Sequence, residues 1–161
     1  MAFKFNPGPP EDAYKFWQDK VPMGRKEFNR LSKDERVKAF IVSGMAKGDQ
    51  LTAMHRSIDQ ALANGQPMAT WKKEIGQSFA AKGWEPLAGF RLDNIFRTNI
   101  QTAYSVGRYR QLTAVAESRP FWRYMAINDG RGRPSHEALH GRVVRHDDPF
   151  WDVFYPLNGF G

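Results

Sequence analysis

Apolar residues recur at helical spacing in the middle of the chain and predict two amphipathic helices joined by a short loop. The first repeat ends at Asn64-Gly65 and the second near Gly83, because glycine commonly follows the last turn of a helix. The apolar positions are Leu51, Met54, Ile58 and Leu62 in the first repeat, and Met68, Trp71, Ile75 and Phe79 in the second. Helices of this kind with short loops pack together, so the pattern indicates a small helical bundle.

Two further helices are expected nearer the N-terminus. The first follows Pro9-Pro10 and carries an aromatic cluster, ending before Pro22 and Gly24; the cluster is Tyr14, Phe16 and Trp17. The second opens at a capping box formed by Ser32 and Glu35. Its apolar face is predicted to hold Val37, Phe40, Ile41 and Met45. His55, between Met54 and Arg56, is expected at the surface.

A long helix is predicted from Leu92 to Ala116, with one apolar and one polar stripe. The apolar stripe holds Leu92, Ile95, Phe96, Ile100 and Ala103, and polar side chains lie on the opposite side. Solvation is the ordinary reason for such a polar stripe, and contact with a partner is the alternative. Past Gly107 the apolar pattern loses phase, so a bend is expected there.

Beyond residue 116 the pattern changes to short elements. An aromatic strand is expected over residues 121–127, and β-branched Val143 and Val144 predict a second strand. Between them, Pro134 and an N-cap at Ser135 begin a helix of about one and a half turns, which a left-handed Gly141 would end. The predicted fold class is α+β and mainly helical. A helical N-terminal half joins a small C-terminal unit of one long helix, one short helix and two to four short strands.

The short helix contains HEALH (residues 136–140), a pattern in which two histidines bind zinc while Glu137 activates water. His146 has the spacing of a third ligand, so His136, His140 and His146 define a zinc peptidase as one alternative. However, the related metalloprotease pattern needs a glycine where this chain has Val143. The predicted helix is also too short for such a site. We therefore predict that the chain has no catalytic residue, metal or cofactor.

The ordered motifs from residue 90 onward resemble the phage head morphogenesis family, the minor head proteins similar to protein F of phage Mu. The resemblance begins in the long helix (residues 96–108) and continues through the aromatic strand to Pro156-Leu157-Asn158-Gly159. Its motif residues, expected to have structural roles, are Asp129, Arg133, Pro134, His136, Leu139, Gly141, Asp148 and Trp151. The family usually has a cysteine-containing tail after the Asn-Gly pair, whereas this chain holds no cysteine.

The resemblance implies a minor head protein of a tailed bacteriophage that binds the portal and takes part in head assembly and in genome packaging or delivery. Its expected partners are the portal, other head proteins and packaged double-stranded DNA. Its expected location is the head interior or the portal vertex, and the host cytoplasm during assembly. Residues 1–85 are predicted to form a helical, portal-contacting region with an extended arm, and residues 86–161 the head morphogenesis unit. The aromatic cluster Tyr14, Phe16 and Trp17 is the candidate portal contact.

Composition and charge limit the classes of protein and of partner that fit this chain. The 161 residues are 41% hydrophobic, enough for one real core, and contain no apolar run near the ~20 residues of a membrane span. The absence of cysteine excludes a disulfide framework. The net charge of +7 favours an acidic partner such as nucleic acid. Arg131, Arg142 and Arg145 are the candidate nucleic-acid contacts, with ion pairs to nearby acids as the alternative. A free-standing DNA-binding protein is therefore a further candidate.

Overall fold

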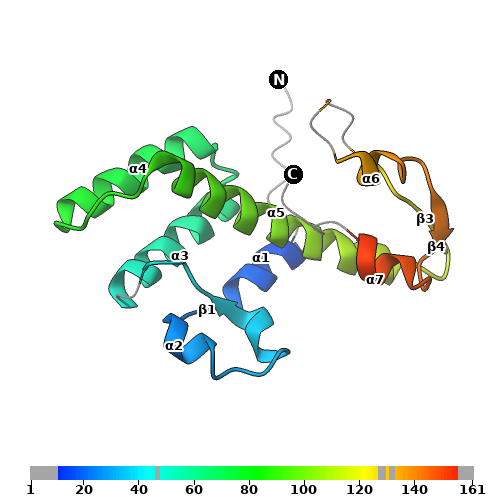
Figure 1. Cartoon of the computed structure of the whole chain (residues 1–161), viewed down its shortest axis with the longest axis horizontal. Helices are drawn as coiled ribbons and strands as arrows, with labels where there is room; N and C mark the ends of the chain where they lie inside the picture. Colours follow the sequence, from blue (N-terminus) through cyan, green and yellow to red (C-terminus); the bar gives the residue numbers. More distant parts are fainter. Residues whose placement is uncertain (1–10, 46–47, 127–129, 131–132, 156–161) are drawn as a thin grey trace, which may run out of the picture. The chain divides into compact units, whose positions relative to one another are not determined.

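The computed structural model describes residues 11–45, 48–126, 130 and 133–155 (Figure 1). It divides into two compact units, Met1–Gly107 and Arg108–Gly161. The described residues form seven α-helices, one 3-10 helix and four short strands in two small sheets. This confirms the mainly helical α+β class. None of the described helices combines the length and the apolar character needed to cross a membrane.

The first unit contains most of the helices. Their order along the chain is α1 (Glu11–Gln18), β1 (Val21–Pro22), α2 (Arg25–Phe28), the 3-10 helix η1 (Glu35–Lys38), β2 (Ala39–Phe40), α3 (Gly48–Asn64), α4 (Met68–Ala81) and the larger part of α5 (Gly89–Ala114). Helix α3 contacts α1, α4 and β1. Because α3 touches three other elements, it forms the centre of this unit.

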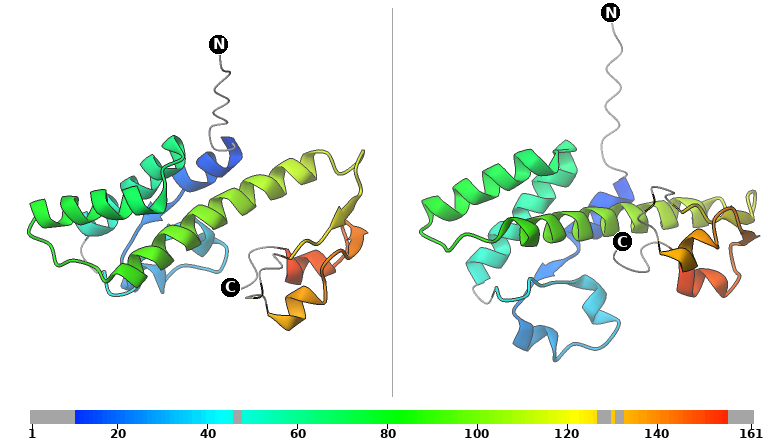
Figure 2. Two further views of the ribbon diagram at one scale, coloured as in Figure 1. Left: turned by 90° about the horizontal axis from the view of Figure 1, so that it is seen from above. Right: turned by 45° about the horizontal axis from the view of Figure 1, so that its top comes forward.

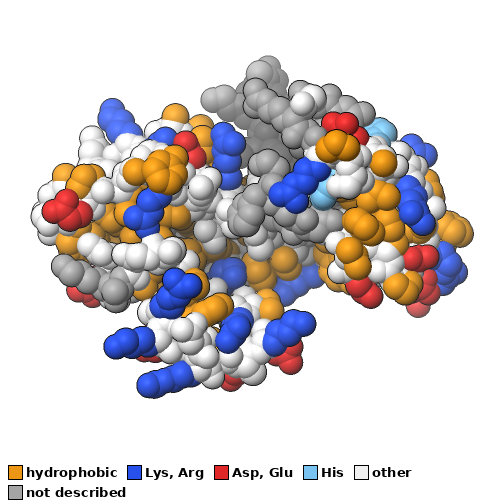
Figure 3. Space-filling model, in the orientation of Figure 1, with side chains coloured by type: hydrophobic (Ala, Val, Ile, Leu, Met, Phe, Trp, Pro, Cys, Tyr) orange, Lys and Arg blue, Asp and Glu red, His pale blue; other side chains and the backbone are white. Residues whose placement is uncertain are grey.

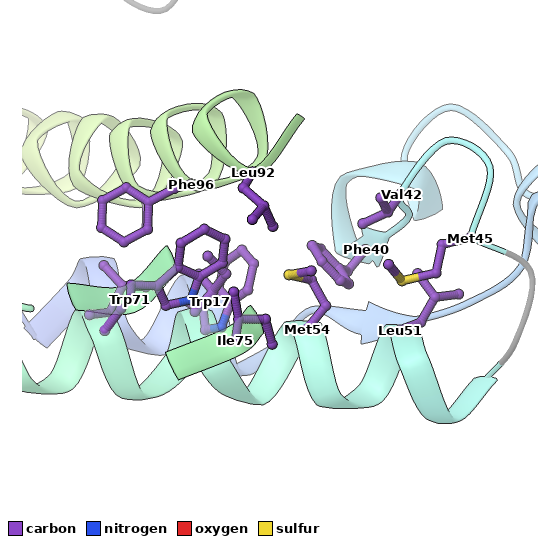
Figure 4. Close-up of a cluster of buried hydrophobic side chains, with 14 of the residues drawn as sticks. Trp17, Phe40, Val42, Met45, Leu51, Met54, Trp71, Ile75, Leu92 and Phe96 are labelled. Carbon is purple, nitrogen blue, oxygen red and sulfur yellow. The ribbon is translucent and has the colours of Figure 1, made fainter. Parts of the chain in front are cut away.

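The core of the first unit lies between α3 and the elements around it. Trp17 from α1 and Trp71 from α4 are almost fully buried. The indole of Trp71 lies 5.0 Å from the ring of Phe96 on α5, measured between centroids, and its Nε1 donates a hydrogen bond to Ser57 Oγ at 3.0 Å. Figure 4 shows Leu92 and Phe96 pointing from α5 toward the side chains of α3 and α4. The apolar positions predicted for α3 and α4 are therefore the ones that build the core.

The helix predicted to start at Ser32 does not form. The capping box is present, since the N–H of Ser32 donates to Glu35 Oε2 and the N–H of Glu35 donates to Ser32 Oγ, but only the short helix η1 follows it. The next residues then form β2, which pairs in parallel with β1. Phe40 is 2% exposed and Val37 59% exposed, so the two do not share an apolar face. Strand pairing and burial of Phe40 therefore override the local helical pattern.

Helix α5 continues unbroken through Gly107, where the sequence predicts a bend (Figure 2). Gly107 is buried because α1 passes close to it. A Cβ atom built on Gly107 would lie 2.8 Å from the backbone nitrogen of Ala13 and 3.0 Å from its Cβ. The glycine therefore permits a close approach of two helices, which explains why the apolar pattern changes at this position.

The second unit contains the end of α5, β3 (Phe121–Arg123), α6 (Pro134–Glu137), β4 (Val143–Arg145) and α7 (Phe150–Phe154). Strands β3 and β4 pair antiparallel, with Trp122 opposite Val144. Both strands were predicted. Helix α6 is shorter than expected, and its N-cap is Arg133, not Ser135, because Pro134 already occupies the first helical position.

Candidate functional site

The motif segment folds around a second aromatic core. Trp122 and Tyr124 from the β3 segment pack against Phe150 and Trp151 from α7, and all four are buried. The ring centroids of Trp122 and Trp151 are 5.6 Å apart, and those of Tyr124 and Phe150 6.1 Å. Leu139, between α6 and β4, packs against the same cluster. Large aromatic side chains supply much burial per residue, so this small unit has a core of its own.

His136 takes part in this core through a hydrogen bond with a tyrosine. The hydroxyl of Tyr124 and Nδ1 of His136 are 3.0 Å apart. Burial raises the pKa of Tyr124, so its hydroxyl stays protonated and can donate to the imidazole. Sequence reasoning did not find this partner. The available signal was that Tyr124 and Trp122 lie two residues apart, which places both on one side of an extended chain.

Gly141 connects α6 to the strands. Its φ is +81°, the left-handed conformation predicted for the end of the short helix, and its N–H donates to the carbonyl of Tyr124 at 2.8 Å. Nothing lies within 4 Å of a Cβ built there. The requirement for glycine is therefore conformational and not steric.

Asp148 and Trp151 fix the start of α7. The carboxylate of Asp148 accepts a hydrogen bond from the N–H of Phe150 at 2.8 Å, as a capping side chain does. The indole Nε1 of Trp151 donates to the carbonyl of Arg145 at 2.8 Å, which ties the helix to the end of β4. The predicted structural motif residues His136, Leu139, Gly141, Asp148 and Trp151 all belong to one unit. Asp129 lies outside the described residues.

The three candidate zinc ligands do not come together. His136 contacts Tyr124, while Nδ1 of His140 lies 3.2 Å from the carbonyl oxygen of Ala126. His146 packs beside Trp122, with ring centroids 5.9 Å apart. Within the described part of the chain, no three His, Cys, Asp or Glu side chains gather as a metal site would require. The structure therefore places His136, His140 and His146 against three different neighbours.

Two of the candidate DNA-contacting arginines make contacts within the unit. Arg145 forms two hydrogen bonds with the carboxylate of Asp147, at 2.9 and 3.0 Å. This pairing lowers the pKa of Asp147 to about 2. The guanidinium of Arg142 lies 4.8 Å from the ring centroid of Phe150, a cation–π geometry. Both residues are exposed, and Arg131 lies outside the described residues.

The candidate portal contact, Tyr14, Phe16 and Trp17, lies largely within the first unit. Trp17 is 0% exposed and Phe16 8% exposed, so both belong to the core of the first unit. Tyr14 is half-buried, and its hydroxyl donates to Asp59 at 3.3 Å. The spacing of these aromatics on α1 predicted a cluster correctly, but their pairing with α3 fills the protein's own core. Their burial leaves little of this cluster available to a partner.

His55 departs from the sequence-based expectation, since it was expected at the surface. Its ring stacks on Trp17 with centroids 4.8 Å apart, and Nε2 lies 3.4 Å from the carbonyl oxygen of Trp17. Burial lowers the pKa of His55 below its ordinary value of 6.5. The imidazole is thus part of the contact between α1 and α3.

A groove that sequence reasoning did not find lies along α3 and α4 in the first unit. It has a volume of about 750 Å³. Its lining combines the indole rings of Trp71 and Trp84 with both acidic and basic side chains, including Arg56 and Glu74. This mixed charge selects no single class of ligand.

Comparison with known proteins agrees with the motif order. The family model for Phage Mu protein F like protein matches residues 35–161. The Mu-like prophage FluMu F protein of Haemophilus influenzae is 38% identical over 137 residues, which cover 78% of this chain and 33% of the relative. The putative capsid assembly protein F of Escherichia phage Mu is 32% identical over 168 residues, covering 94% of this chain and 38% of the relative. No solved structure matches the chain.

The second unit thus combines an aromatic core with an antiparallel strand pair. The chain belongs to the Phage Mu protein F like family, because the family model covers well over half of its residues. It spans about a third of the length of these two relatives.

Proposed function

We propose that the chain acts as a minor head protein of a tailed bacteriophage or prophage, binding the portal and taking part in head assembly and genome packaging or delivery. The observation that carries this proposal is the family match over residues 35–161, together with a phage Mu relative named a putative capsid assembly protein. The chain spans about a third of the length of those relatives. The partners and activities of the whole relatives are therefore proposed for this chain. Its location would be the head interior or the portal vertex, after assembly in the host cytoplasm.

The proposed contact with a head protein lies on the outer face of the β3–β4 sheet. Phe121 lies two residues from Arg123, which pairs with Val143, and both alternate residues of a strand and paired residues share a face. Phe121 and Val143 therefore lie on the same side, away from the buried Trp122. Phe121 is 63% exposed and Val143 49% exposed, and the neighbouring Met125 is 60% exposed. Exposed apolar side chains that lie together on one surface favour a protein contact.

Arginines on the same face extend this surface. Arg123 and Arg145 alternate with the apolar residues, opposite Val143 and Phe121 respectively. An apolar centre with arginine at its edge is typical of protein interfaces. The partner that fits this face is therefore a head protein with an apolar patch bordered by acidic side chains. Binding of this kind needs no reaction centre.

The experiment is incorporation of the chain into heads that contain portal protein. A Phe121→Ser/Val143→Ser double variant should enter heads in reduced amount, because it removes the apolar centre of the face. A matched control, Phe90→Ser, changes a 68% exposed aromatic residue in the first unit and should enter normally. Circular dichroism should show all variants folded. Absence of the unchanged chain from purified heads would contradict the function, and normal incorporation of the double variant would contradict only the assigned face.

A deletion test of the N-terminal arm should stop at residue 10. Removing residues 1–20 would also remove Trp17 from the core of the first unit and so disrupt the fold of that unit. A chain that lacks residues 1–10 keeps α1 intact. Reduced incorporation of this shorter variant would support a role of the arm in portal binding, and normal incorporation would assign binding to other surfaces.

A further inference from the structure

The charge of the chain is concentrated in one segment that the sequence motifs do not cover. Residues 20–38, here called the basic loop, hold seven Lys and Arg residues against three Asp and Glu, a net charge of +4. The whole chain has a net charge of +7. More than half of the excess charge therefore lies in a small part of the sequence. Figure 3 shows Lys and Arg side chains gathered at the bottom of the view, where Figure 1 places α2.

The basic loop is held at its base by strand pairing. Its ends meet in the parallel β1–β2 pair, and the N–H of Met23 donates to the carbonyl of Phe40 at 3.0 Å. The ammonium of Lys20 donates to the carbonyls of Val37 and Ala39 at 3.1 and 3.4 Å. Phe40 is buried in the core. The loop is thus a defined projection from the first unit, carrying α2 and η1.

Two of the three acidic residues of the basic loop, Glu27 and Glu35, accept hydrogen bonds from backbone groups. Glu27 Oε2 accepts from the N–H of Gly24 at 3.0 Å, and Glu35 Oε2 accepts from the N–H of Ser32 at 2.8 Å. Glu27 thereby takes part in a capping box at the start of α2, and no ion pair within the described residues involves Glu27 or Glu35. No ion pair within the described residues involves the six exposed cations of the loop, Arg25, Lys26, Arg30, Lys33, Arg36 and Lys38.

Arg142 and Arg145, the candidate nucleic-acid contacts from the sequence, differ from these cations because each already has a partner within the second unit. Arg145 already has a carboxylate partner in Asp147, and Arg142 lies over the ring of Phe150. A phosphate would have to compete with these contacts. Arg25, Lys26, Arg30, Lys33 and Lys38 have no ion-pair partner among the described residues that a phosphate would displace, so the electrostatic attraction of these cations to a polyanion is larger.

We propose that the basic loop binds the phosphate backbone of double-stranded DNA. The inference rests on the proposed function in one respect, because packaged DNA is the polyanion that a head protein meets. Lysine is depleted at the centres of protein interfaces, whereas Lys and Arg side chains that neutralise phosphates account for non-specific DNA binding. The guanidinium of Arg36 lies 5.0 Å from the ring centroid of Phe28, and the other Lys and Arg side chains from Arg25 to Lys38 are exposed. These features favour DNA over an acidic protein.

The test is DNA binding by the full chain with a labelled duplex of mixed sequence over a range of salt concentrations. The variant Arg25→Gln/Lys26→Gln/Arg30→Gln removes three exposed charges from the loop. The matched control Lys73→Gln/Arg97→Gln/Arg110→Gln removes three exposed charges from α4 and α5. Each lost phosphate contact lowers the slope of log affinity against log salt by about 0.9. The slope for the loop variant should therefore be smaller in magnitude by roughly two to three, and its affinity for DNA about tenfold or more weaker. The slope and the affinity of the control variant should change little.

The outcomes separate the DNA site from the head protein function. Equal affinity of the loop variant and the unchanged chain would overturn the proposal, as would absence of DNA binding by the unchanged chain. If the loop variant enters heads poorly but binds DNA normally, the loop contacts an acidic protein surface and the proposal also fails. Loss of DNA affinity with normal entry into heads would support it. Unchanged melting temperatures would show that the substitutions leave the fold intact.

Discussion

Replacing Gly107 by alanine should destabilise the first unit, although alanine ordinarily strengthens a helix. Gly107 lies inside α5, where glycine costs about 1 kcal/mol relative to alanine in an open helix. Here an added Cβ would lie 2.8 Å from the nitrogen and 3.1 Å from the Cα of Ala13. These are backbone atoms of α1, so no side-chain rotation relieves the contact. Helix α1 would have to move as a body.

The magnitude follows from two opposing effects. Overpacking of a close contact costs about 1–3 kcal/mol, and the gain in helix propensity returns about 1 kcal/mol. Movement of α1 would also loosen Trp17 and Ala13, which are both 0% exposed. We therefore expect the upper part of the overpacking range and a net loss of about 1–2 kcal/mol.

The assay is thermal or urea unfolding of Gly107→Ala beside a matched control, Gly76→Ala. Gly76 lies inside α4, and nothing is within 4 Å of the position that a Cβ atom would occupy there, so alanine should stabilise by about 0.5–1 kcal/mol. The melting temperatures should move in opposite directions, by roughly 2–4 °C per kcal/mol for a chain of this size. If both variants were stabilised equally, the close approach of α1 to α5 would be refuted.

Three further predictions concern single residues. Gly141→Ala should destabilise the second unit by about 1 kcal/mol in urea unfolding because of the left-handed backbone; an unchanged midpoint would contradict this. The pKa of His55 is lowered in the folded state, so the neutral imidazole is favoured there. The contribution of His55 to the free energy of unfolding is therefore complete above pH 6.5 and is lost as pH falls below that value. His55→Gln should flatten this part of the stability profile. Glu137→Gln should leave head incorporation and phage infectivity unchanged, whereas loss of infectivity with normal assembly would restore a catalytic role.

Helical periodicity predicted the long elements well because their cores follow from spacing alone. Helices α3 and α4 have the expected apolar faces, and Leu51, Met54, Ile58, Trp71 and Phe79 are all buried. The prediction failed after Ser32, where a local capping box competed with a non-local strand pair. Phe40 is buried opposite Pro22, and no spacing within residues 32–45 contains that information. Tertiary contact therefore decided the structure of this segment.

The sequence predicted the motifs of the candidate site, but it did not predict which side chains contact one another. The short strands and the left-handed Gly141 followed from residue type and order. The partners of His136 and Arg142 depend on how the β3 segment and α7 pack, which a linear sequence does not state. The same limit explains the aromatic cluster on α1. Its spacing is equally suited to a partner's surface and to the protein's own core.

The parallel pairing of β1 and β2 holds the two ends of the basic loop, so the sequence between them can change without altering the packed helices. The chain leaves the packed core of the first unit near Met23 and returns to it at Phe40, where the N–H of Met23 donates to the carbonyl of Phe40. Doubling the length of a flexible loop between fixed ends costs only about 0.6 kcal/mol. Insertions, deletions and charge changes between these points can therefore accumulate with little penalty to the packed helices. Related phages can adjust the electrostatic character of this protein without redesigning its fold.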